Sequence, residues 1–273
     1  MISIELISKG EPSLKNVLDS IQNQTYKDYE IICANSSNNI DVKSLLLKYN
    51  CKVIDIQENS RALIARYTAH KYAKGDKSLI LDSTRPLKSN ALEILYKNYD
   101  NYDMVIIRED SLGKGFWVKQ AKLLKDISEM QSRRLTNETL AFLLPRFYNS
   151  DLLSEAFDHI IKDTGKLFDE ISYGEHHIIF DECKKLSDNI GITNEILLSH
   201  YEDSSLKKII KKYYWYGTSQ KVLKHLSGSA ASNLSTHMRK NVDFKMRMKT
   251  IPISAARGVP FILGYLFGKN KDE

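Results

Sequence analysis

The sequence has few cysteines, and their placement excludes a disulfide framework and a cysteine-bound metal. Only three occur in 273 residues, Cys33, Cys51 and Cys183. They are too few for a framework of cross-links, they lie within apolar segments, and their spacing lacks the close pairs typical of metal ligands. A reducing, cytoplasmic compartment fits this composition.

Long hydrophobic runs are also scarce. Glu5 interrupts the short apolar start of the chain, so we expect no signal peptide. Residues 251–268 are mostly apolar, but two prolines and Arg257 are expected to break this segment. The uninterrupted part, residues 259–268, is too short to span a bilayer.

A glycine-rich phosphate loop is missing as well. Lys9-Gly10 is a poor substitute for one, and residues 113–117 are too poor in glycine, so we predict a turn there. A sugar-1-phosphate nucleotidyltransferase needs such a loop near its N-terminus. That activity is therefore only a lesser alternative.

The sequence does contain a regular alternation of strand and helix signals. Apolar runs read as strands, and apolar residues spaced by three and four read as helices, the first of them capped by Ser13. The polar run at 34–39 can only be a loop. Such alternation predicts an α/β fold with a parallel sheet flanked by helices. The strands are predicted at 2–8, 29–33, 51–56 and 78–81, and the helices at 14–21 and 60–73.

The strand predicted at 78–81 runs directly into Asp82, which is followed by Ser83 and Thr84. A buried strand of this kind delivers its last side chain to the carboxyl edge of the sheet, where open α/β sheets bind ligands. A carboxylate there can hold a divalent metal or a ribose. The alternative is an aspartate that only caps the next turn.

Several phrases in this region resemble family 2 glycosyltransferases of the GT-A fold. They are SIQNQTY at 20–26 with EII at 30–32, SRALIARYTAHKYAKGD at 60–76 and SLILDST at 78–84, in that order. The resemblance is specific over about the first ninety residues and resumes in patches to about residue 220. It implies a Rossmann-like, mixed and mostly parallel sheet flanked by helices. The catalytic domain would comprise residues 1–203, with a nucleotide half at about 1–110 and an acceptor half at about 111–203.

The resemblance also implies a site for a nucleotide-diphosphate sugar. Asn35 replaces the aspartate usual after the second strand, and because it carries no charge the base preference can differ from the usual uridine. Arg66 takes the place of a family arginine; it can pair with Asp82, bind a phosphate, or lie on an exposed helix face. The residues assigned to the donor are Ser8, Lys9, Glu11, Asn35, Arg66, Asp82 and Ser83.

The family's metal motif, Asp-x-Asp, is reduced here to Asp82-Ser83-Thr84. One carboxylate with phosphate oxygens can suffice for Mn²⁺ or Mg²⁺, and the resemblance adds His200 as a second ligand. A metal-free site that uses Arg85 or another cation is the alternative.

The acceptor is expected to lose its proton to a base near residue 175. The segment Gly174-Glu175-His176 resembles the family's GED box, and either Glu175 or His176 can titrate in the needed range. Alternatively, these residues only begin a helix whose dipole they complement. Arg146, in a phrase found on the acceptor side in the family, is a candidate contact for a lipid phosphate.

Charge is distributed unevenly along the chain. Residues 204–273 contain 14 Lys and Arg but 3 Asp and Glu, a net charge of +11 that leaves −5 for residues 1–203. We predict a basic, amphipathic helical region that anchors the protein peripherally on an anionic membrane surface, with Phe261, Tyr265 and Phe267 at the interface. The alternative is a C-terminal helix packed on the body. Nucleic acid is not expected as a partner, because no recognition fold is apparent.

Together these patterns predict a cytoplasmic glycosyltransferase at the membrane surface. It would move a sugar from a UDP- or GDP-linked donor, GDP-mannose included, to a lipid-linked or membrane-associated acceptor, with assistance from a metal. A non-catalytic relative that binds nucleotide sugar or membrane is the alternative, because both acidic motifs depart from the family pattern.

Overall fold

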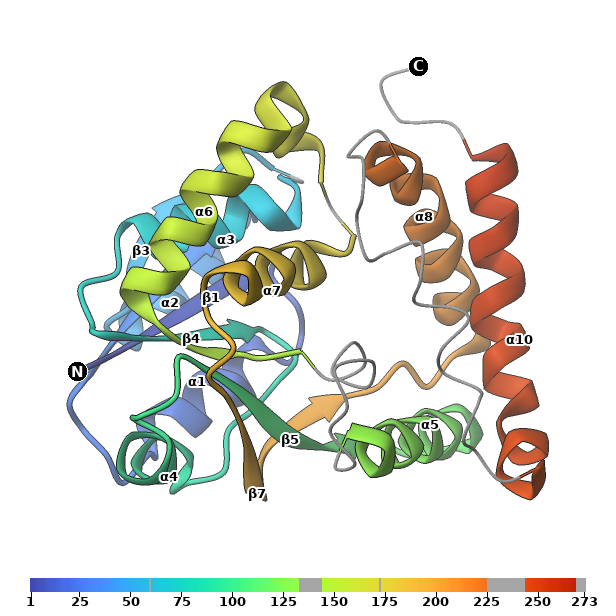
Figure 1. The fold of residues 1–273 in the computed structure, drawn as a ribbon, viewed down its shortest axis with the longest axis horizontal. Helices are drawn as coiled ribbons and strands as arrows, with labels where there is room; N and C mark the ends of the chain where they lie inside the picture. Colours follow the sequence, from blue (N-terminus) through green and yellow to red (C-terminus); the bar gives the residue numbers. More distant parts are fainter. Residues whose placement is uncertain (59, 133–143, 172, 225–243, 269–273) are drawn as a thin grey trace. The chain divides into compact units, whose positions relative to one another are not determined.

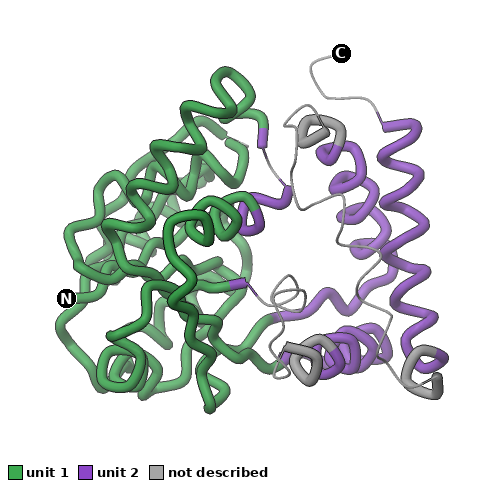
Figure 2. The backbone as a smooth tube through the Cα atoms, in the orientation of Figure 1, with its two compact units in different colours: residues 1–110, 145–170, 178–200 green, residues 111–144, 171–177, 201–273 purple. Residues whose placement is uncertain are grey.

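The computed structural model describes residues 1–58, 60–132, 144–171, 173–224 and 244–268. The chain forms two compact units (Figure 2). The first comprises residues 1–110, 145–170 and 178–200, and the second comprises residues 111–144, 171–177 and 201–273. The second unit thus combines the basic C-terminal region with two segments from the middle of the chain.

A seven-stranded sheet, ordered β3-β2-β1-β4-β6-β5-β7, forms the centre of the first unit (Figure 1). β1, β2, β3 and β4 are parallel, whereas β6 is antiparallel to both β4 and β5. The predicted mixed, mostly parallel sheet is confirmed. The strands are β1 (Ile2–Ser8), β2 (Tyr29–Asn35), β3 (Lys52–Asp55), β4 (Lys77–Asp82), β5 (Met104–Leu112), β6 (Phe147–Asn149) and β7 (Ile190–Tyr201).

Helices connect and cover these strands, as the alternating pattern predicts. Those with all or most of their residues in the first unit are α1 (Leu14–Gln22), α2 (Ile40–Lys48), α3 (Ala62–Lys71), α4 (Ala91–Asn98), α6 (Ser150–Thr164), the 3₁₀ helix η1 (Gly165–Glu170) and α7 (Glu175–Leu186). The second unit contains α5 (Phe116–Ser132), α8 (Leu206–Lys224) and α10 (Phe244–Phe267).

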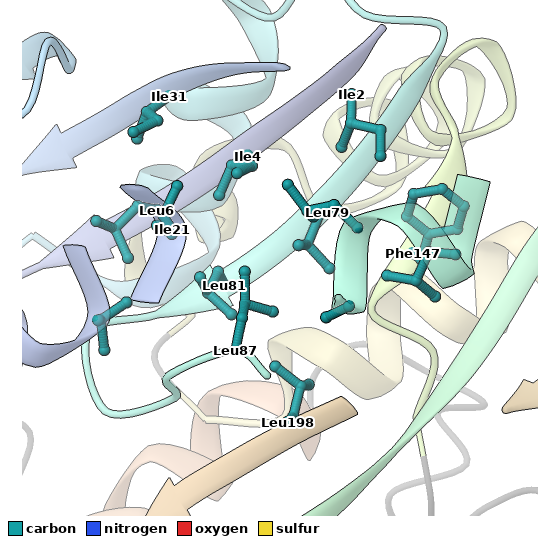
Figure 3. Packing of buried hydrophobic residues seen from close by; sticks show 14 of the residues in the cluster. Ile2, Ile4, Leu6, Ile21, Ile31, Leu79, Leu81, Leu87, Phe147 and Leu198 are labelled. Carbon is teal, nitrogen blue, oxygen red and sulfur yellow. The ribbon is translucent and has the colours of Figure 1, made fainter. Parts of the chain in front are cut away.

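The core lies mainly on one face of the sheet (Figure 3). Side chains alternate along a strand, so Ile2, Ile4 and Leu6 of β1 point to the same face. Apolar residues of α1 spaced by three and four, such as Ile21, pack against them. On the other face, α3 packs small residues such as Ala65 against β2.

This second face also carries a buried polar group that the sequence patterns do not predict. Glu5, in the middle of β1, lies 2.9 Å through its carboxylate from Nδ1 of His70 on α3. Nε2 of His70 lies 2.9 Å from the hydroxyl of Ser154 on α6. These bonds satisfy polar groups that would be costly to bury without partners.

The strand register brings the predicted site residues to one edge of the sheet. Ser8 is paired with Asn35, Asn35 with Asp55, and Ile7 with Asp82. Asn35 is therefore the last residue of β2, and the prediction that residues 34–39 are all loop is wrong for the first two. They extend the strand because β1 and β3 pair with it on both sides.

Ser13 does not cap α1 through its side chain as predicted. Its hydroxyl instead donates to the carbonyl oxygen of Ser83 at 2.8 Å. The long-range bond competes with the local one, and it ties the start of α1 to the turn that follows β4.

In the second unit, α10 packs along α8 and also contacts α5. The prolines expected to break this helix, Pro252 and Pro260, lie inside it, and α10 continues to Phe267. Packing against α8 offsets the cost of the missing backbone donors. Within the described part of the chain, only the segment Met248–Phe267 is long and apolar enough to cross a membrane, judged by length and composition. This segment includes most of the uninterrupted apolar run at 259–268 together with the two prolines and Arg257 that were expected to break it.

Candidate active site

Three arginines converge on Asp82, the last residue of β4. Arg66 of α3 bonds to one carboxylate oxygen, Oδ1, and Arg85 bonds to the other, Oδ2. The guanidinium of Arg146 lies 3.2 Å from Oδ2. Arg85 also bonds through Nε to the carboxylate of Glu109 on β5, at 3.0 Å. The site therefore joins residues from four segments that are distant in the sequence.

Of the alternatives that the sequence leaves open for Arg66, the structure shows its pairing with Asp82. The side chain of Arg66 is only 1% exposed, so the alternative of a surface arginine is excluded. One of its nitrogens also donates to the carbonyl oxygen of Leu81 at 2.9 Å. Arg66 is thereby held beneath the end of β4 and orients the Asp82 carboxylate.

Arg146 lies at this same edge, although the sequence predicts a position on the acceptor side. Its backbone joins β4 and β5, because its carbonyl accepts from Ile80 and its amide donates to Val105. Burial, and then the positive charge of Arg85, lower the pKa of Arg146 to about 10. It remains protonated at neutral pH.

Glu11 organises the loop that follows β1. Its carboxylate accepts from the Ser8 hydroxyl at 3.2 Å, from the Lys9 amide at 3.0 Å, and from the Ser83 hydroxyl. The two loops at the carboxyl ends of β1 and β4 are thus bonded to one carboxylate. Four residues assigned to the donor by resemblance are brought together here, and Glu11 has a structural part in placing the others.

Asn35 is buried and shares this edge with Asp55, the last residue of β3. The Asn35 amide donates to the Asp55 carboxylate at 2.9 Å. The pKa of Asp55 is lowered, first by its bond with Lys43 and then by the bond from Asn35. Asp55 therefore places a charged carboxylate one strand away from the position where the family usually has one.

The side chains around Asp82 are not suited to bind a divalent cation. Both oxygens of Asp82 accept from guanidinium groups, and the Ser83 hydroxyl donates to Glu11. Within the described residues there is no group of three or more His, Cys, Asp and Glu side chains that could hold a metal, so Asp82 and His200 do not form part of one. His200 follows Ser199 on β7, whose amide donates to the Pro86 carbonyl at 2.9 Å. A cation at Asp82 would have to displace guanidinium groups while remaining close to their charge.

The predicted base lies in the second unit. Glu175 begins α7 after Gly174, whose φ of 81° suits glycine, so the predicted helix start is confirmed. The carboxylate of Glu175 lies 3.7 Å from Nε2 of His176, and each side chain is 14% exposed. Burial lowers the pKa of the neighbouring His177 to about 4, which makes that side chain a weak base.

An aromatic cluster holds the segment just before Glu175. The ring of Tyr173 stacks on that of Tyr216 from α8, with centroids 4.4 Å apart. It meets Phe261 of α10 edge to face at 5.8 Å. Both contacts lie within the second unit, so α8 and α10 support the segment that carries the predicted base.

Sequence reasoning missed Glu109, Asp55 and Tyr173, and it did not foresee that Arg146 lies beside Arg85. No local signal places Glu109 and Arg146 beside Asp82, because only the pairing of β4, β5 and β6 brings them together. Asp55 could have been found as the polar residue that ends a predicted strand, the signal that identifies Asp82.

Comparisons with known proteins agree with this architecture. The family described as Glycosyl transferase family 2 matches residues 6–166. The uncharacterized glycosyltransferase YwdF of Bacillus subtilis (strain 168) is 31% identical over 107 residues, which are 38% of this chain and 40% of YwdF. The match thus spans less than half of that relative's length.

Among solved structures, S. aureus TarS 1–349 superimposes with a TM-score of 0.57 at 16% identity, covering 97% of this chain and 80% of that one. The same protein in complex with UDP-GlcNAc gives 0.54 at 16% identity, with coverage of 97% and 81%. Similarity at this level of identity shows the GT-A fold alone. Because the family match covers more than half of the residues, the chain belongs to glycosyl transferase family 2.

Proposed function

We propose that this glycosyltransferase uses a UDP-linked sugar as its donor, with a GDP-linked sugar as the alternative. The observation that carries the proposal is the row of side chains at the carboxyl ends of β1 to β4, where Ser8, Asn35, Asp55 and Asp82 are aligned by the register. The TarS structures determined with UDP-GlcNAc and with UDP support UDP as the nucleotide.

Within this proposal, Asp55 recognises the base. Its carboxylate is held by the Asn35 amide and Lys43 and is about half exposed, so it can accept an N–H from a ligand. Uracil offers one such N–H group, and guanine offers two that are adjacent. The uncharged Asn35 then positions Asp55 and does not take over its contact with the base.

The transfer itself needs one bond formed and one broken. The acceptor oxygen bonds to the anomeric carbon, the bond from that carbon to the diphosphate breaks with its electron pair, and the nucleoside diphosphate leaves. The acceptor proton passes to Glu175 or His176, which we propose act as a pair. Lys9 and Ser83 lie in the two loops that Glu11 joins and would line the donor.

Calorimetric titration with UDP and GDP tests the nucleotide. We expect UDP to bind, and Asp55→Asn to weaken both UDP and uridine about tenfold because a charged acceptor is lost. Asp41→Asn, which changes an exposed acid in the first turn of α2, is the matched control. Tighter binding of GDP would select the alternative, and binding of neither nucleotide would refute the proposal.

For the acceptor we propose a lipid-linked or membrane-associated molecule. On α10, apolar side chains at spacings of three and four form one stripe with exposed fractions of 44 to 71%: Val259, Ile262, Leu263, Leu266 and Phe267. A row of five exposed apolar side chains is unusual on a protein surface that binds no partner or membrane. Lys207, Lys208 and Lys211 of α8 are also exposed, and the whole region has a net charge of +11.

These features favour an anionic lipid surface as the occupant of the stripe. Arg257 lies in the middle of α10 with its guanidinium 5.3 Å from the ring centre of Tyr213 on α8. A charge at mid-helix is costly in a bilayer core, which favours a helix lying at the interface over one that spans it. Such binding would place the protein on the cytoplasmic face of the membrane.

Sedimentation with vesicles tests this surface. We expect binding to phosphatidylglycerol vesicles, little binding to phosphatidylcholine vesicles, and loss of binding in the double variant Ile262→Ser, Leu266→Ser. Ile40→Ser, which removes an apolar side chain that is 70% exposed on α2, is the control. Absence of binding to anionic vesicles would refute the membrane proposal without affecting the donor proposal.

Glycosyltransferases of the GT-A fold often use a divalent cation. The Mn²⁺ or Mg²⁺ expected from the sequence at Asp82 and His200 does not fit the arrangement of guanidinium groups around Asp82, and no step of the transfer proposed above depends on it. Titration with UDP in the presence and absence of Mn²⁺ checks it directly.

A further inference from the structure

Five charged side chains meet around Asp82 and do not neutralise one another. Three guanidinium groups, from Arg66, Arg85 and Arg146, meet two carboxylates, from Asp82 and Glu109. The net charge of these five groups is +1, at the sheet edge where the donor is proposed to bind. A bound anion would lower the cost of holding this excess charge in a partly buried place.

The arginines differ in how far a ligand can reach them. Arg66 is 1% exposed and is occupied by Leu81 and Asp82, so it serves to fix the carboxylate. Arg85 and Arg146 are 16% and 12% exposed, and both contact the second oxygen of that carboxylate. The two guanidinium groups therefore lie beside the same oxygen of Asp82, and both keep some exposed surface that a ligand can contact.

The pKa of Arg146 points in the same direction. Burial and the neighbouring Arg85 lower it to about 10, although Asp82 and Glu109 oppose this change. The two carboxylates thus leave part of the cost of this charge uncompensated. The binding of an anion beside Arg146 would reverse that effect.

Resting on the proposed function, we infer that Arg85 and Arg146 bind the diphosphate of the donor directly, in place of a divalent cation. Asp82, held by Arg66, is then a positioning residue for the two arginines rather than a metal ligand. Guanidinium groups match pairs of phosphate oxygens and carry a permanent charge. They supply the positive charge that stabilises the diphosphate as it leaves.

Calorimetry on the full chain in EDTA and in Mn²⁺ tests this inference. We expect UDP to bind with the same affinity in both solutions, and Mn²⁺ alone to give no binding heat. Arg85→Gln and Arg146→Gln should each weaken UDP about 10- to 100-fold, as expected for the loss of a charge-assisted bond. Uridine, which has no phosphate, should bind these variants as it binds the unaltered protein.

Arg108→Gln is the matched control, because Arg108 lies on β5 in the same unit and its guanidinium bonds to the Asn194 carbonyl. If Arg146→Gln unfolds, Arg85→Gln, at the more exposed of the two positions, decides the question. Unchanged UDP affinity in Arg85→Gln would overturn the inference, because the arginines would then only stabilise the fold.

Asp82→Asn separates the two roles of the carboxylate. Asparagine keeps an oxygen acceptor for Arg66 and removes a negative charge, so we expect UDP affinity in EDTA to be kept or to increase. Binding that requires Mn²⁺ and is lost in Asp82→Asn would overturn the inference and leave the proposed function standing. Failure of UDP and GDP to bind in either solution would overturn both.

Discussion

The crossing of α8 and α10 makes one substitution sharply predictable. A Cβ added to Gly264 of α10 would lie 1.9 Å from the carbonyl oxygen of Tyr214 on α8. Gly217 of α8 is in the same position, because its Cβ would lie 1.9 Å from the carbonyl oxygen of Phe261. The two backbones are therefore in direct contact at this crossing.

Gly264→Ala should force the helices apart. A carbon atom approaches a carbonyl oxygen to about 3.3 Å, so the backbones must separate by about 1.4 Å. A gap of this size removes much of the dispersion energy of the interface, and overpacking typically costs about 1–3 kcal/mol or more. Replacing glycine by alanine within a helix by itself stabilises the helix by about 1 kcal/mol. Because a separation of about 1.4 Å places the cost at the upper end of that range, we expect a net loss of about 2 kcal/mol in the free energy of unfolding of the second unit.

Gly258→Ala is the matched control in the same helix. Among the described residues, nothing lies within 4 Å of a Cβ at this position. Only the effect of helix propensity remains, so this variant should gain about 0.5–1 kcal/mol. The two substitutions are chemically identical and have opposite expected signs.

Urea unfolding followed by tryptophan fluorescence measures the effect. The two tryptophans, Trp117 and Trp215, both belong to the second unit, so their fluorescence reports on it selectively. The midpoint should fall for Gly264→Ala and rise for Gly258→Ala. Equal shifts for both variants, or a stabilised Gly264→Ala, would refute the close crossing of α8 and α10.

The remaining predictions concern the base segment and the buried side chains. If Glu175 is the base, attack opposite the leaving diphosphate inverts the anomeric carbon, and retention seen in the product by NMR would contradict this. Tyr173→Ala should lower kcat about tenfold or more with little change in KM for the donor, because the base segment loses its support, whereas Tyr173→Phe keeps the stacked ring and the activity. Because the pKa of His177 falls from 6.5 to about 4 on folding, the folded state binds fewer protons between these values. Through this group the free energy of unfolding therefore falls by about 2–3 kcal/mol as the pH drops from 6.5 to 4, and His177→Asn should remove this contribution from the pH dependence of unfolding. Burial raises the pKa of Cys51 and of Cys183 to about 12, so neither thiol should react with a thiol reagent until the protein unfolds; rapid labelling of the folded protein would show that they are accessible.

Local pattern determined the four parallel strands β1 to β4 and the position of Asp82, but not β5, β6 and β7. The first strand has the predicted bounds, Ile2–Ser8, and Asp82 ends β4 as the apolar run before it indicates. The spacing of apolar residues is a property of consecutive residues, so it can be recognised without knowledge of the fold. For the same reason, the start of α7 at Glu175 could be foreseen from the glycine and acid that precede an apolar run.

The surroundings of Asp82 were decided only by the tertiary structure. A family phrase offered pairing with Asp82 as one of several roles for Arg66, whereas Arg146 and Glu109 reach the site through the pairing of β6 and β5. Whether a carboxylate can hold a cation depends on the charges around it, and those come from segments far apart in the chain.

The C-terminal region shows the same division. Sequence alone determined that it is basic and largely apolar near its end, because these are sums over residues. It suggested a segment broken by two prolines, but α10 is a continuous helix. A proline costs a helix a fixed amount of free energy, and only the packing of α10 on α8, which the sequence does not reveal, determines whether that cost is offset.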